Sequence, residues 1–296
     1  MVGGKNTSTS TIRIEWYDHL VQARRPLWKR ILNLPRSAVR IGVQPWWSVA
    51  ELLQSDTGRE YGIGLNAKRK LLMAMSRNAE QPGSAAVFFE HVMLVTRLLK
   101  VPAALEGAVA EFGCYKGFST SSLSLACALT GRRLMVFDSF EGLPAPEAAV
   151  VNLDSGRAIP YAQGQFAGTL EEVKSNVAKF GDLSVCEFVK GYFDATLPGR
   201  DPGEKFVMIF EDVDLPESVR TVIRWAWPKL QPGCTFFCHE ARDHEVVEMF
   251  FDRNWWARTT GEPAPGFLGS GCGLMTGPTT DWCCLGYTIR RARTGA

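Results

Sequence analysis

The chain has 296 residues, of which 46% are apolar and 22% charged, and it carries a formal net charge of +2. This balance is typical of a globular protein and excludes a disordered chain, a collagen-like repeat and a coiled coil. A protein that is basic throughout in order to bind nucleic acid carries a much larger positive excess, so we predict no nucleic-acid partner. The length is compatible with one large domain or two small ones.

Positive charge is concentrated at the N-terminus. Residues 1–40 contain eight Lys and Arg side chains against two acidic ones, a net charge of +6, which leaves −4 for the rest of the chain. We interpret this basic arm as a solvated face beside the core. A contact with an anionic surface or an acidic partner is the alternative.

The sequence predicts neither a membrane span nor a secretory signal. A span needs about 20 consecutive apolar residues, and every long apolar run here is interrupted by charge, Gly or Pro. The N-terminus also lacks the apolar segment of a signal peptide. Because the cysteines lie mostly in apolar segments, we expect reduced, buried thiols and a cytoplasmic protein. They are Cys114, Cys127, Cys186, Cys234, Cys238, Cys272, Cys283 and Cys284.

The first hundred residues are predicted to be mainly helical. Residues 1–12 are polar and rich in Ser and Thr, and we expect a loose tail there. In residues 85–100, apolar side chains recur at helical spacing. We therefore predict an N-terminal tail and helical cap over residues 1–100, followed by a main domain over residues 101–296. The cap is expected to cover a ligand or to form the interface of a homodimer.

From Gly107 onward, short apolar runs alternate with segments of helical spacing. We predict strands at 108–112, 134–138, 183–191, 205–212 and 234–240. We predict helices at 119–129, 169–180, 217–230 and 242–252, with Gly181 directly after the second of these. Residues 139–168 form a long insertion rich in Gly, Pro and Ala, and residues 271–275 and 282–291 are expected to pair as an antiparallel hairpin.

This alternation predicts an α/β fold with helices on both faces of a parallel sheet. A parallel core that ends in an antiparallel hairpin is the sheet pattern of class I methyltransferases. We therefore expect a Rossmann-like, mostly parallel, seven-stranded sheet.

The loop after the first predicted strand has the features of a ligand site. In open α/β sheets, ligands bind outside the carboxyl ends of the strands. Glu111 stands there, followed by Gly113 and Gly117, whose freedom permits a tight turn close to a ligand. The pattern lacks the third glycine of a dinucleotide-binding loop, and an acidic residue repels a pyrophosphate. A cationic ligand such as a sulfonium amino acid suits this acid.

A second acidic residue, Asp138, ends the next predicted strand. A carboxylate at this place can accept hydrogen bonds from both hydroxyls of a ribose. Together, Glu111 and Asp138 favour a nucleoside-containing cationic ligand. An ordinary glycine turn with a helix-capping acid is the alternative.

Several segments resemble the macrocin O-methyltransferase family, which methylates sugar hydroxyls of natural products. The likeness begins with Asp-Ser-Phe-Glu-Gly-Leu-Pro at 138–144 and covers about residues 105–250. Further segments that agree in order are 166–170, 190–198, 212–215 and 228–233. The resemblance implies S-adenosylmethionine as cofactor. It implies a cofactor site lined by Glu111, Gly113, Tyr115, Gly117, Ser119, Asp138, Ser139, Gly191 and Tyr192.

The ends of the fourth and fifth predicted strands carry the residues expected to perform chemistry. In the resembled family, an acid after the fourth strand and an Asp-Asp or Asp-Asn pair after the fifth bind magnesium. Asp212 matches the first ligand, whereas His239 and Glu240 occupy the positions of the pair. This is a departure from the family, because Mg²⁺ prefers oxygen ligands. Mn²⁺, Fe²⁺ or Zn²⁺ would accept a histidine nitrogen as a ligand.

Two interpretations of this site stay open. In the first, a divalent metal, Mg²⁺ or Mn²⁺, is held by Asp212, His239 and Glu240 and activates the hydroxyl. In the second, no metal binds, and His239 removes the proton while Asp212 or Glu240 orients it. Asp212 and His239 are the catalytic residues in either case. An ordinary polar cluster without a role is the third possibility. For Asp214 a structural or helix-capping role is favoured over catalysis.

Other residues of interest lie around the predicted pocket. Trp255, Trp256 and Phe267 are candidates for stacking on a sugar or aromatic ring. Asp243 and His244 lie at the start of the predicted helix at 242–252, where capping is favoured over the alternative that one of them reaches the pocket. A zinc site from Cys234, Cys238, His239 and His244 is disfavoured, because their spacing does not match known zinc motifs.

The best overall interpretation is an O-methyltransferase that acts on a hydroxyl of a small molecule, such as a natural product or its sugar. One alternative keeps the fold but acts without a metal on a carboxyl, nitrogen or carbon. Another is a protein that binds the cofactor or a partner without catalysis. A nicotinamide-dependent oxidoreductase is disfavoured by the missing glycine and by Glu111.

Overall fold

The structure is a computed structural model that describes residues 46–153, 155–267, 269–270 and 285–291. The basic arm, the predicted strand at 271–275 and three of the cysteines lie outside these residues. The described part belongs to one compact unit, which begins at Pro45.

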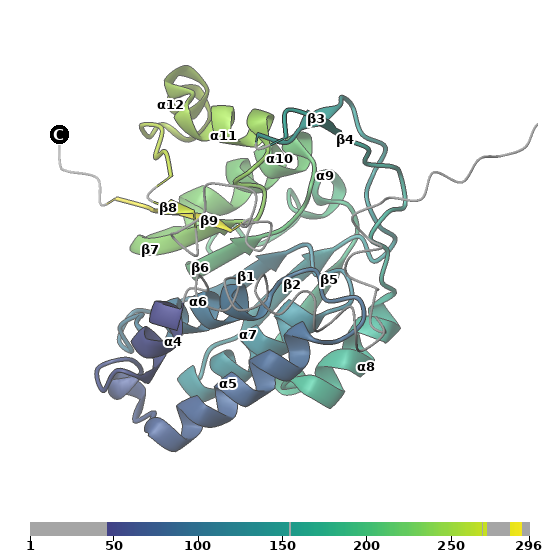
Figure 1. Cartoon of the computed structure of the whole chain (residues 1–296). Helices are drawn as coiled ribbons and strands as arrows, with labels where there is room; N and C mark the ends of the chain where they lie inside the picture. The colour runs from purple at the N-terminus through teal and green to yellow at the C-terminus, as the bar shows by residue number, and fades with distance from the viewer. Residues whose placement is uncertain (1–45, 154, 268, 271–284, 292–296) are drawn as a thin grey trace, which may run out of the picture. The chain divides into compact units, whose positions relative to one another are not determined.

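A sheet of seven strands forms the centre of the described unit, in the order β5-β2-β1-β6-β7-β9-β8 (Figure 1). The first five strands in this order run parallel, and β9 is antiparallel to both of its neighbours. The parallel core and the antiparallel end were both predicted. The strands are β1 (Ala108–Phe112), β2 (Leu134–Asp138), β5 (Cys186–Lys190), β6 (Phe206–Glu211), β7 (Leu230–Cys238), β8 (Gly269–Ser270) and β9 (Gly286–Ile289).

Helices cover both faces of the sheet, and Figure 1 shows α5, α6 and α7 on one side and α10 and α11 on the other. Helices α5 and α6 both pack against α7, and α4 packs against α6. The α-helices are α4 (Trp46–Leu53), α5 (Leu65–Ala79), α6 (Phe88–Leu99), α7 (Phe118–Thr130), α8 (Leu170–Phe180), α9 (Phe193–Thr196), α10 (Pro216–Ala226), α11 (His244–Phe251) and α12 (Arg253–Thr260). Short 3-10 turns are η1 (Arg59–Tyr61), η2 (Leu183–Val185) and η3 (Trp227–Lys229).

The central strands are buried from end to end. Every residue of β1 and β6 is buried, as expected for parallel strands covered on both faces. Side chains of the preceding helices, such as Leu52, Met75 and Val92, belong to the same apolar core. The helices before residue 100 and the sheet after it thus share one apolar interior. The division of the chain into two parts at residue 100 stays a prediction.

Several predicted elements differ in extent from those observed. The predicted strand at 183–191 begins as the η2 turn, and the predicted helix at 217–230 ends at Ala226 and continues as η3. Within the insertion 139–168, the two-residue strands β3 (Val150–Val151) and β4 (Ala158–Ile159) pair with each other. These two strands were not predicted, because two residues are too few to show a periodic pattern. Helix α12 was not predicted either.

Gly181 caps α8, although for a different reason than expected. Its φ of −133° is not the left-handed conformation in which a glycine commonly ends a helix. A Cβ atom at this position would lie 2.4 Å from the Ser124 hydroxyl oxygen and 2.8 Å from the Cα of Ser121. The glycine therefore allows the end of α8 to approach α7.

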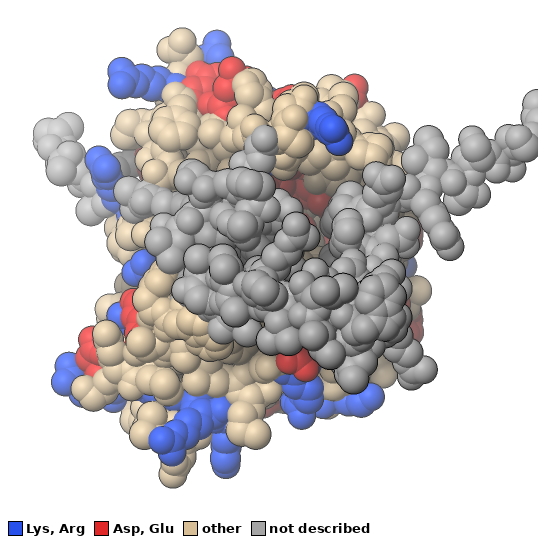
Figure 2. Space-filling view, in the orientation of Figure 1, with Lys and Arg blue, Asp and Glu red and all other residues tan. Residues whose placement is uncertain are grey.

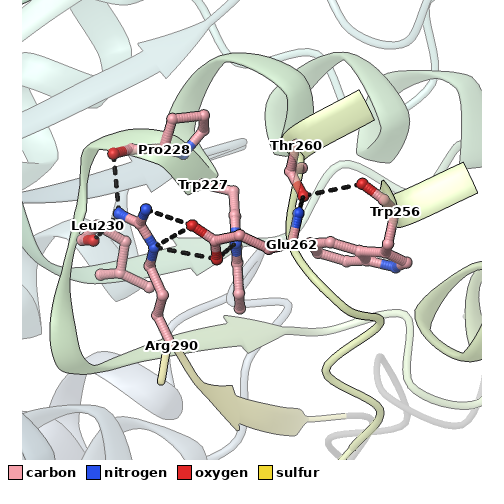
Figure 3. A network of polar contacts seen from close by, with 7 residues as sticks. All are labelled: Trp227, Pro228, Leu230, Trp256, Thr260, Glu262 and Arg290. Atoms are coloured by element: carbon pink, nitrogen blue, oxygen red, sulfur yellow. Dashed lines mark hydrogen bonds and ion pairs between the residues drawn. The ribbon is translucent and has the colours of Figure 1, made fainter. Parts of the chain in front are cut away.

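Arg290 ties the end of β9 to the start of β7 (Figure 3). Its guanidinium donates to the carboxylate of Glu262 at 2.5 Å and to the carbonyl oxygens of Pro228 and Leu230 at 2.8 and 2.5 Å. The indole nitrogen of Trp227 donates to the same carboxylate at 2.8 Å. This network holds the antiparallel end of the sheet against the parallel core.

In the orientation of Figure 1, Lys and Arg side chains gather on the lower side, over α5 and α8 (Figure 2). None of the described helices combines the length and apolar character that a membrane span needs. The five described cysteines are free thiols, four of them buried.

Candidate functional site

The turn after β1 is built for close approach of the backbone. Gly113 has a φ of +78°, and a Cβ atom there would lie 1.9 Å from the backbone oxygen of Asp212. The amide of Asp212 in turn donates to the carbonyl of Phe112 at 2.9 Å. The ends of β1 and β6 are thus in direct contact, so the predicted cofactor half and chemical half of the site are adjacent.

Glu111 is fully buried at the end of β1. One of its carboxylate oxygens accepts a hydrogen bond from the hydroxyl of Ser119 at 2.7 Å, while the other has no partner among the described residues. Burial raises the pKa of Glu111 to about 8, against the lowering effect of the nearby hydroxyls of Ser119 and Thr120. A buried carboxyl oxygen without a partner is a strong acceptor for a cationic or N–H group.

Asp138, at the end of β2, organises the loops on either side of it. Its carboxylate accepts from the amide of Cys114 at 2.7 Å and from the amide of Phe140 at 2.6 Å. Its own carbonyl accepts from the amide of Gly191, which follows β5. Burial raises the pKa of Asp138, although these backbone bonds oppose the rise. The thiol of Cys114 and the amide of Tyr115 also bond this carboxylate, so a ribose hydroxyl would share or replace one of these bonds.

The remaining predicted cofactor residues surround these two acids. Gly117 begins α7 with a φ of +78°, and Gly191 follows β5 with a φ of +137°. Tyr115 adopts a left-handed φ of +47°, and its ring meets the edge of Phe166 at 5.7 Å. The hydroxyl of Ser139 donates to the carbonyl of Gly142 and accepts from the amide of Glu141. Tyr192 directly precedes α9 as its cap residue. Their contact with a cofactor stays a prediction.

Asp212 and His239 meet at the ends of β6 and β7. The two strands pair with Glu211 opposite Cys238, and the amide of His239 donates to the carbonyl of Glu211. This register places Nδ1 of His239 3.1 Å from Oδ1 of Asp212. The predicted convergence of these two strand ends is therefore observed.

A third side chain, Glu90, contacts the same imidazole and was not predicted. It lies on α6, and its Oε2 is 3.5 Å from Nε2 of His239, with only 2% of the side chain exposed. The same oxygen accepts from the amide of Val87 at the start of the helix. In the sequence it looks like a helix-capping acid, and nothing in its spacing indicates that α6 delivers it to a residue 149 positions away.

His239 is therefore enclosed by two carboxylates. Burial alone lowers the pKa of His239, but Asp212 and Glu90 raise it more, so that the net pKa lies well above the usual value for histidine. The imidazole is then protonated at neutral pH, with an N–H on each nitrogen. A protonated imidazole has no lone pair with which to accept a proton or bind a metal. This arrangement does not favour the predicted role of His239 as a base.

Glu240 supports the neighbouring turn. Its Oε1 accepts from the amides of Val213 and Asp214, both at 2.7 Å, and its Oε2 accepts from the thiol of Cys238. Burial and the nearby acids raise the pKa of Glu240 well above the usual range. The side chain is thus occupied in holding the loop after β6 in shape.

A divalent metal was predicted at Asp212, His239 and Glu240. One potential ligand atom from each lies within 4.8 Å of the others, which meets the requirement for proximity. The donor set, however, does not fit a divalent cation as arranged, because both nitrogens of His239 face carboxylates and Glu240 bonds two amides. A second buried group, Glu211, Cys238 and Glu240, is equally close. There, burial raises the pKa of the Cys238 thiol, which keeps it protonated.

Further acids and a tyrosine extend this cluster. Burial raises the pKa of Glu211 to about 8, and those of Asp214 and Asp243 to about 7. The side chain of Asp214 is hydrogen-bonded to Tyr161 of the insertion. Asp214 has a φ of +62° and lies outside α10, whose cap residue is Leu215, so its predicted capping role is wrong.

The insertion reaches the site by docking on α11. The amide of Leu153 donates to the carbonyl of Arg242 at 2.8 Å, and the amide of Val151 donates to Glu245 at 3.0 Å. Asp243 begins α11, but its side chain makes no capping hydrogen bond, contrary to prediction. The segment 143–165 therefore links the end of β2 to the end of β7.

The aromatic residues predicted to stack on substrate differ in their surroundings. Trp256 is fully buried, with its indole nitrogen donating to the carbonyl of Met249, and so cannot stack on a ligand. Trp255 and Phe267 pack against the core and are partly exposed. The disfavoured zinc site gains no support, because His244 instead faces Glu248 at 3.8 Å.

Comparison with known proteins identifies the family of this chain and supports its fold. The sequence signature described as macrocin O-methyltransferase (TylF) matches residues 96–255, more than half of the chain. The chain belongs to the macrocin O-methyltransferase family. The matched segment includes both halves of the site, from Glu111 to Glu240. It begins after Glu90, which therefore lies outside it.

A curated relative of this macrocin O-methyltransferase family member matches a shorter part of the chain than the family signature does. Over 133 residues it is 34% identical to the 8-demethyl-8-(2,3-dimethoxy-α-L-rhamnosyl)-tetracenomycin-C 4′-O-methyltransferase of Streptomyces olivaceus. The alignment covers 43% of this chain and 50% of that protein, so this chain spans about half the length of the curated relative it matches.

Among solved structures, the O-methyltransferase NovP is similar with a TM-score of 0.54 and 20% identity, covering 75% of this chain and 88% of NovP. This likeness confirms the class I methyltransferase fold. The calicheamicin methyltransferase CalS11 is similar with a TM-score of 0.47 and 16% identity, over 98% of each chain.

Proposed function

We propose that this protein transfers the methyl group of S-adenosylmethionine to a hydroxyl of a small molecule, either a natural product or its sugar. The observation that carries the proposal is the contact between the ends of β1 and β6. It places the unpartnered carboxyl oxygen of Glu111 in the same edge of the sheet as Asp212. The family and the name of the tetracenomycin relative support a sugar hydroxyl as the acceptor.

The residues of the first half fit the cofactor. Glu111 offers a buried acceptor for an ammonium group, and Asp138 stands at the end of β2, where a carboxylate can bind ribose hydroxyls. S-adenosylmethionine, when bound, supplies a methyl carbon that the acceptor oxygen takes while S-adenosylhomocysteine leaves. The chain contributes alignment of the acceptor and a place for its proton.

The acceptor hydroxyl must lose a proton as the new C–O bond forms. Asp212 and Asp214 are the two candidates to receive it, because His239 already holds protons on both nitrogens. Asp212 is the more accessible, with 18% of its side chain exposed. Asp214 is held by Tyr161 and has a pKa raised by burial to about 7. A proton acceptor in hydrogen-bond reach of the substrate contributes about 10²–10⁴-fold to the rate.

A divalent cation, Mg²⁺ or Mn²⁺, is the alternative means of activating the hydroxyl. Asp212, His239 and Glu240 would hold it, and it would lower the pKa of the bound hydroxyl. The close approach of their ligand atoms supports this version. Metal binding in this version requires that Glu240 rotate away from the two amides and that His239 lose one proton.

The deciding experiment is calorimetric titration of the full chain with S-adenosylmethionine, followed by a methyl-transfer assay on deoxysugars and glycosylated polyketides. Binding with methyl transfer supports the proposal, and the product's methyl position identifies the acceptor atom. Binding with transfer only to a carboxyl, nitrogen or carbon would overturn the hydroxyl assignment. Binding without transfer would support a non-catalytic role, and no binding would overturn the cofactor itself. A cytoplasmic location and a homodimer remain predictions.

A further inference from the structure

His239 has the surroundings of a buried cation. Its Nδ1 lies 3.1 Å from Asp212 and its Nε2 lies 3.5 Å from Glu90. The edge of its ring faces Phe210, whose centroid is 6.5 Å away. The side chain is only 17% exposed, so water screens these charges weakly.

The hydrogen-bonding capacity of these groups determines the charge of the ring. An ionised carboxylate only accepts hydrogen bonds, so an imidazole between two carboxylates must donate from both nitrogens. A neutral imidazole has one N–H and cannot do so. With both carboxylates ionised, this arrangement favours a positively charged His239, because only the doubly protonated ring can donate to each of them.

The other acids near the ring come from the same strand ends. Asp214 follows β6, Glu240 follows β7, and Asp243 precedes α11; each is electrostatically coupled to His239. Glu211 is coupled to it as well. A group of acids this deeply buried needs positive charge or protons, since isolated buried charges are very costly.

We propose that His239, held between Asp212 and Glu90, takes the place of a divalent cation in this protein and makes the site independent of metal. The inference rests on the proposed function, because a metal at this site would serve the acceptor hydroxyl. His239 and Glu90 act here as positioning residues. They fix the carboxylate of Asp212 and balance its charge without touching the reacting atoms.

The first test compares metal binding by the wild-type chain and by His239→Asp. The variant replaces the imidazole by a carboxylate. Asp212 and Glu90 then lose their positively charged partner, so these acids should attract a hard cation. After chelator treatment, Mn²⁺ is titrated into each protein and followed by its electron paramagnetic resonance. We expect Mn²⁺ to bind His239→Asp about 10–100-fold more tightly than the wild type. His239→Asn serves as the matched neutral control and should not gain this affinity.

Tight, stoichiometric Mn²⁺ binding by the wild type that is lost in His239→Ala would overturn the proposal. It would show that the imidazole is a ligand rather than a substitute for the metal. The same conclusion would follow if chelation abolished wild-type activity and Mg²⁺ restored it.

The second test keeps the proposal measurable even if His239→Asp fails to fold. The chain has four histidines, so nitrogen-15 spectra of labelled wild-type protein can resolve the His239 ring. We expect both of its nitrogens to be protonated at pH 7 and to stay so in Glu141→Gln, a control at an exposed acid. Glu90→Gln removes one carboxylate but keeps an acceptor for the Val87 amide, and it should lower the pKa of His239. A neutral ring in the wild type at pH 7 would overturn the proposal.

These outcomes are separate from a failure of the proposed function. The charge of His239 and the affinity for Mn²⁺ are measured without cofactor or acceptor. If S-adenosylmethionine did not bind, the proposed function would fail while a protonated, metal-free His239 would still be observed. If the cofactor bound and the wild type required a metal, only the present inference would fail.

Discussion

The Cα of Gly113 lies so close to Asp212 that a Cβ atom on it would be 1.9 Å from the backbone oxygen of Asp212. These two residues stand at the ends of β1 and β6, where the proposed cofactor and acceptor sites adjoin. Any side chain at position 113 would push these strand ends apart. The glycine is therefore required by the spacing of the two halves of the site as well as by its φ of +78°.

Gly113→Ala is expected to lower the free energy of unfolding by about 3–6 kcal/mol, as the sum of a left-handed alanine and a severe steric overlap. Gly131→Ala is the matched control. Gly131 has a similar φ of +66°, but nothing lies within 4 Å of its Cβ position. Denaturant unfolding should show a loss of about 1–2 kcal/mol there. Equal losses at the two positions would mean that the contact with Asp212 has no energetic weight.

Asp138→Asn should weaken cofactor binding. The amide replaces one acceptor oxygen by a donor, which removes a bond to the loop or to a ribose hydroxyl. We expect the affinity for S-adenosylhomocysteine to fall by about 10–100-fold, equivalent to about 1.4–2.8 kcal/mol, in a calorimetric titration. Asp201→Asn is the matched control, because this exposed carboxylate lies outside the site and accepts from the amide of Gly203 in its own turn. An unchanged affinity in Asp138→Asn would exclude Asp138 from the cofactor site.

Asp212→Asn should stop turnover but leave cofactor binding intact. Its carboxylate is a candidate to receive the acceptor proton, and an amide cannot do so, so kcat should fall by about 10²–10⁴-fold. Single-turnover assays and cofactor titrations separate the two effects. Asp214→Asn is measured in parallel. A large loss at position 214 with a small one at position 212 would assign the proton to Asp214.

Stability should fall as the pH rises from about 5 to 8. The folded chain keeps protons on Glu111 and Glu211 up to a pKa of about 8, whereas unfolded carboxyls release theirs near 4.5. Each group therefore contributes stability that is complete below its unfolded pKa and lost as the pH approaches 8. The slope is up to about 1.4 kcal/mol per pH unit for each proton.

Glu211→Gln replaces one of these two titrating carboxyls by an amide that neither binds nor releases a proton in this pH range. The variant should gain stability relative to the wild type as the pH increases from 5 to 9, measured by urea unfolding at each pH. Glu141→Gln, at a side chain that is 61% exposed, should follow the wild-type curve. A constant difference between Glu211→Gln and the wild type across this range would mean that Glu211 is ionised in the folded state.

Arg290→Met should destabilise the antiparallel end of the sheet. The guanidinium and Glu262 are only 13% and 9% exposed, and removing one partner leaves a buried charge without compensation. The expected loss is about 3–5 kcal/mol in denaturant unfolding. Arg291→Met, at the exposed neighbouring position, should cost less than about 0.5 kcal/mol. A similar small loss at Arg290 would show that the network in Figure 3 adds little stability.

The main elements of the fold could be predicted because buried strands and helices have recognisable patterns of apolar residues in the sequence. Strands such as Phe206–Glu211 are buried on both faces and appear as continuous apolar runs. The docking of Val151 and Leu153 on α11 left no such pattern, since backbone amides make it. The role of Gly181 was also hidden, because a close approach between two helices depends on tertiary packing.

The site was predictable to the extent that strand ends lie together in a parallel sheet. That rule alone indicates the meeting of Asp212 and His239. It gives no information on Glu90, which comes from a helix ahead of the first strand, or on Tyr161, which a long insertion delivers. It also gives no information on protonation, because the charge of His239 depends on both of its neighbours.

The position of Glu90 has a consequence for how this site can be inherited. Residue 90 lies outside the segment 96–255 that matches the family, and a cut at residue 100 would separate it from His239. A chimaera that exchanged only the matching segment between two family members would pair each position 239 with a foreign helix. Positions 90 and 239 should therefore change together between relatives, and the unit of exchange that preserves the site must include α6.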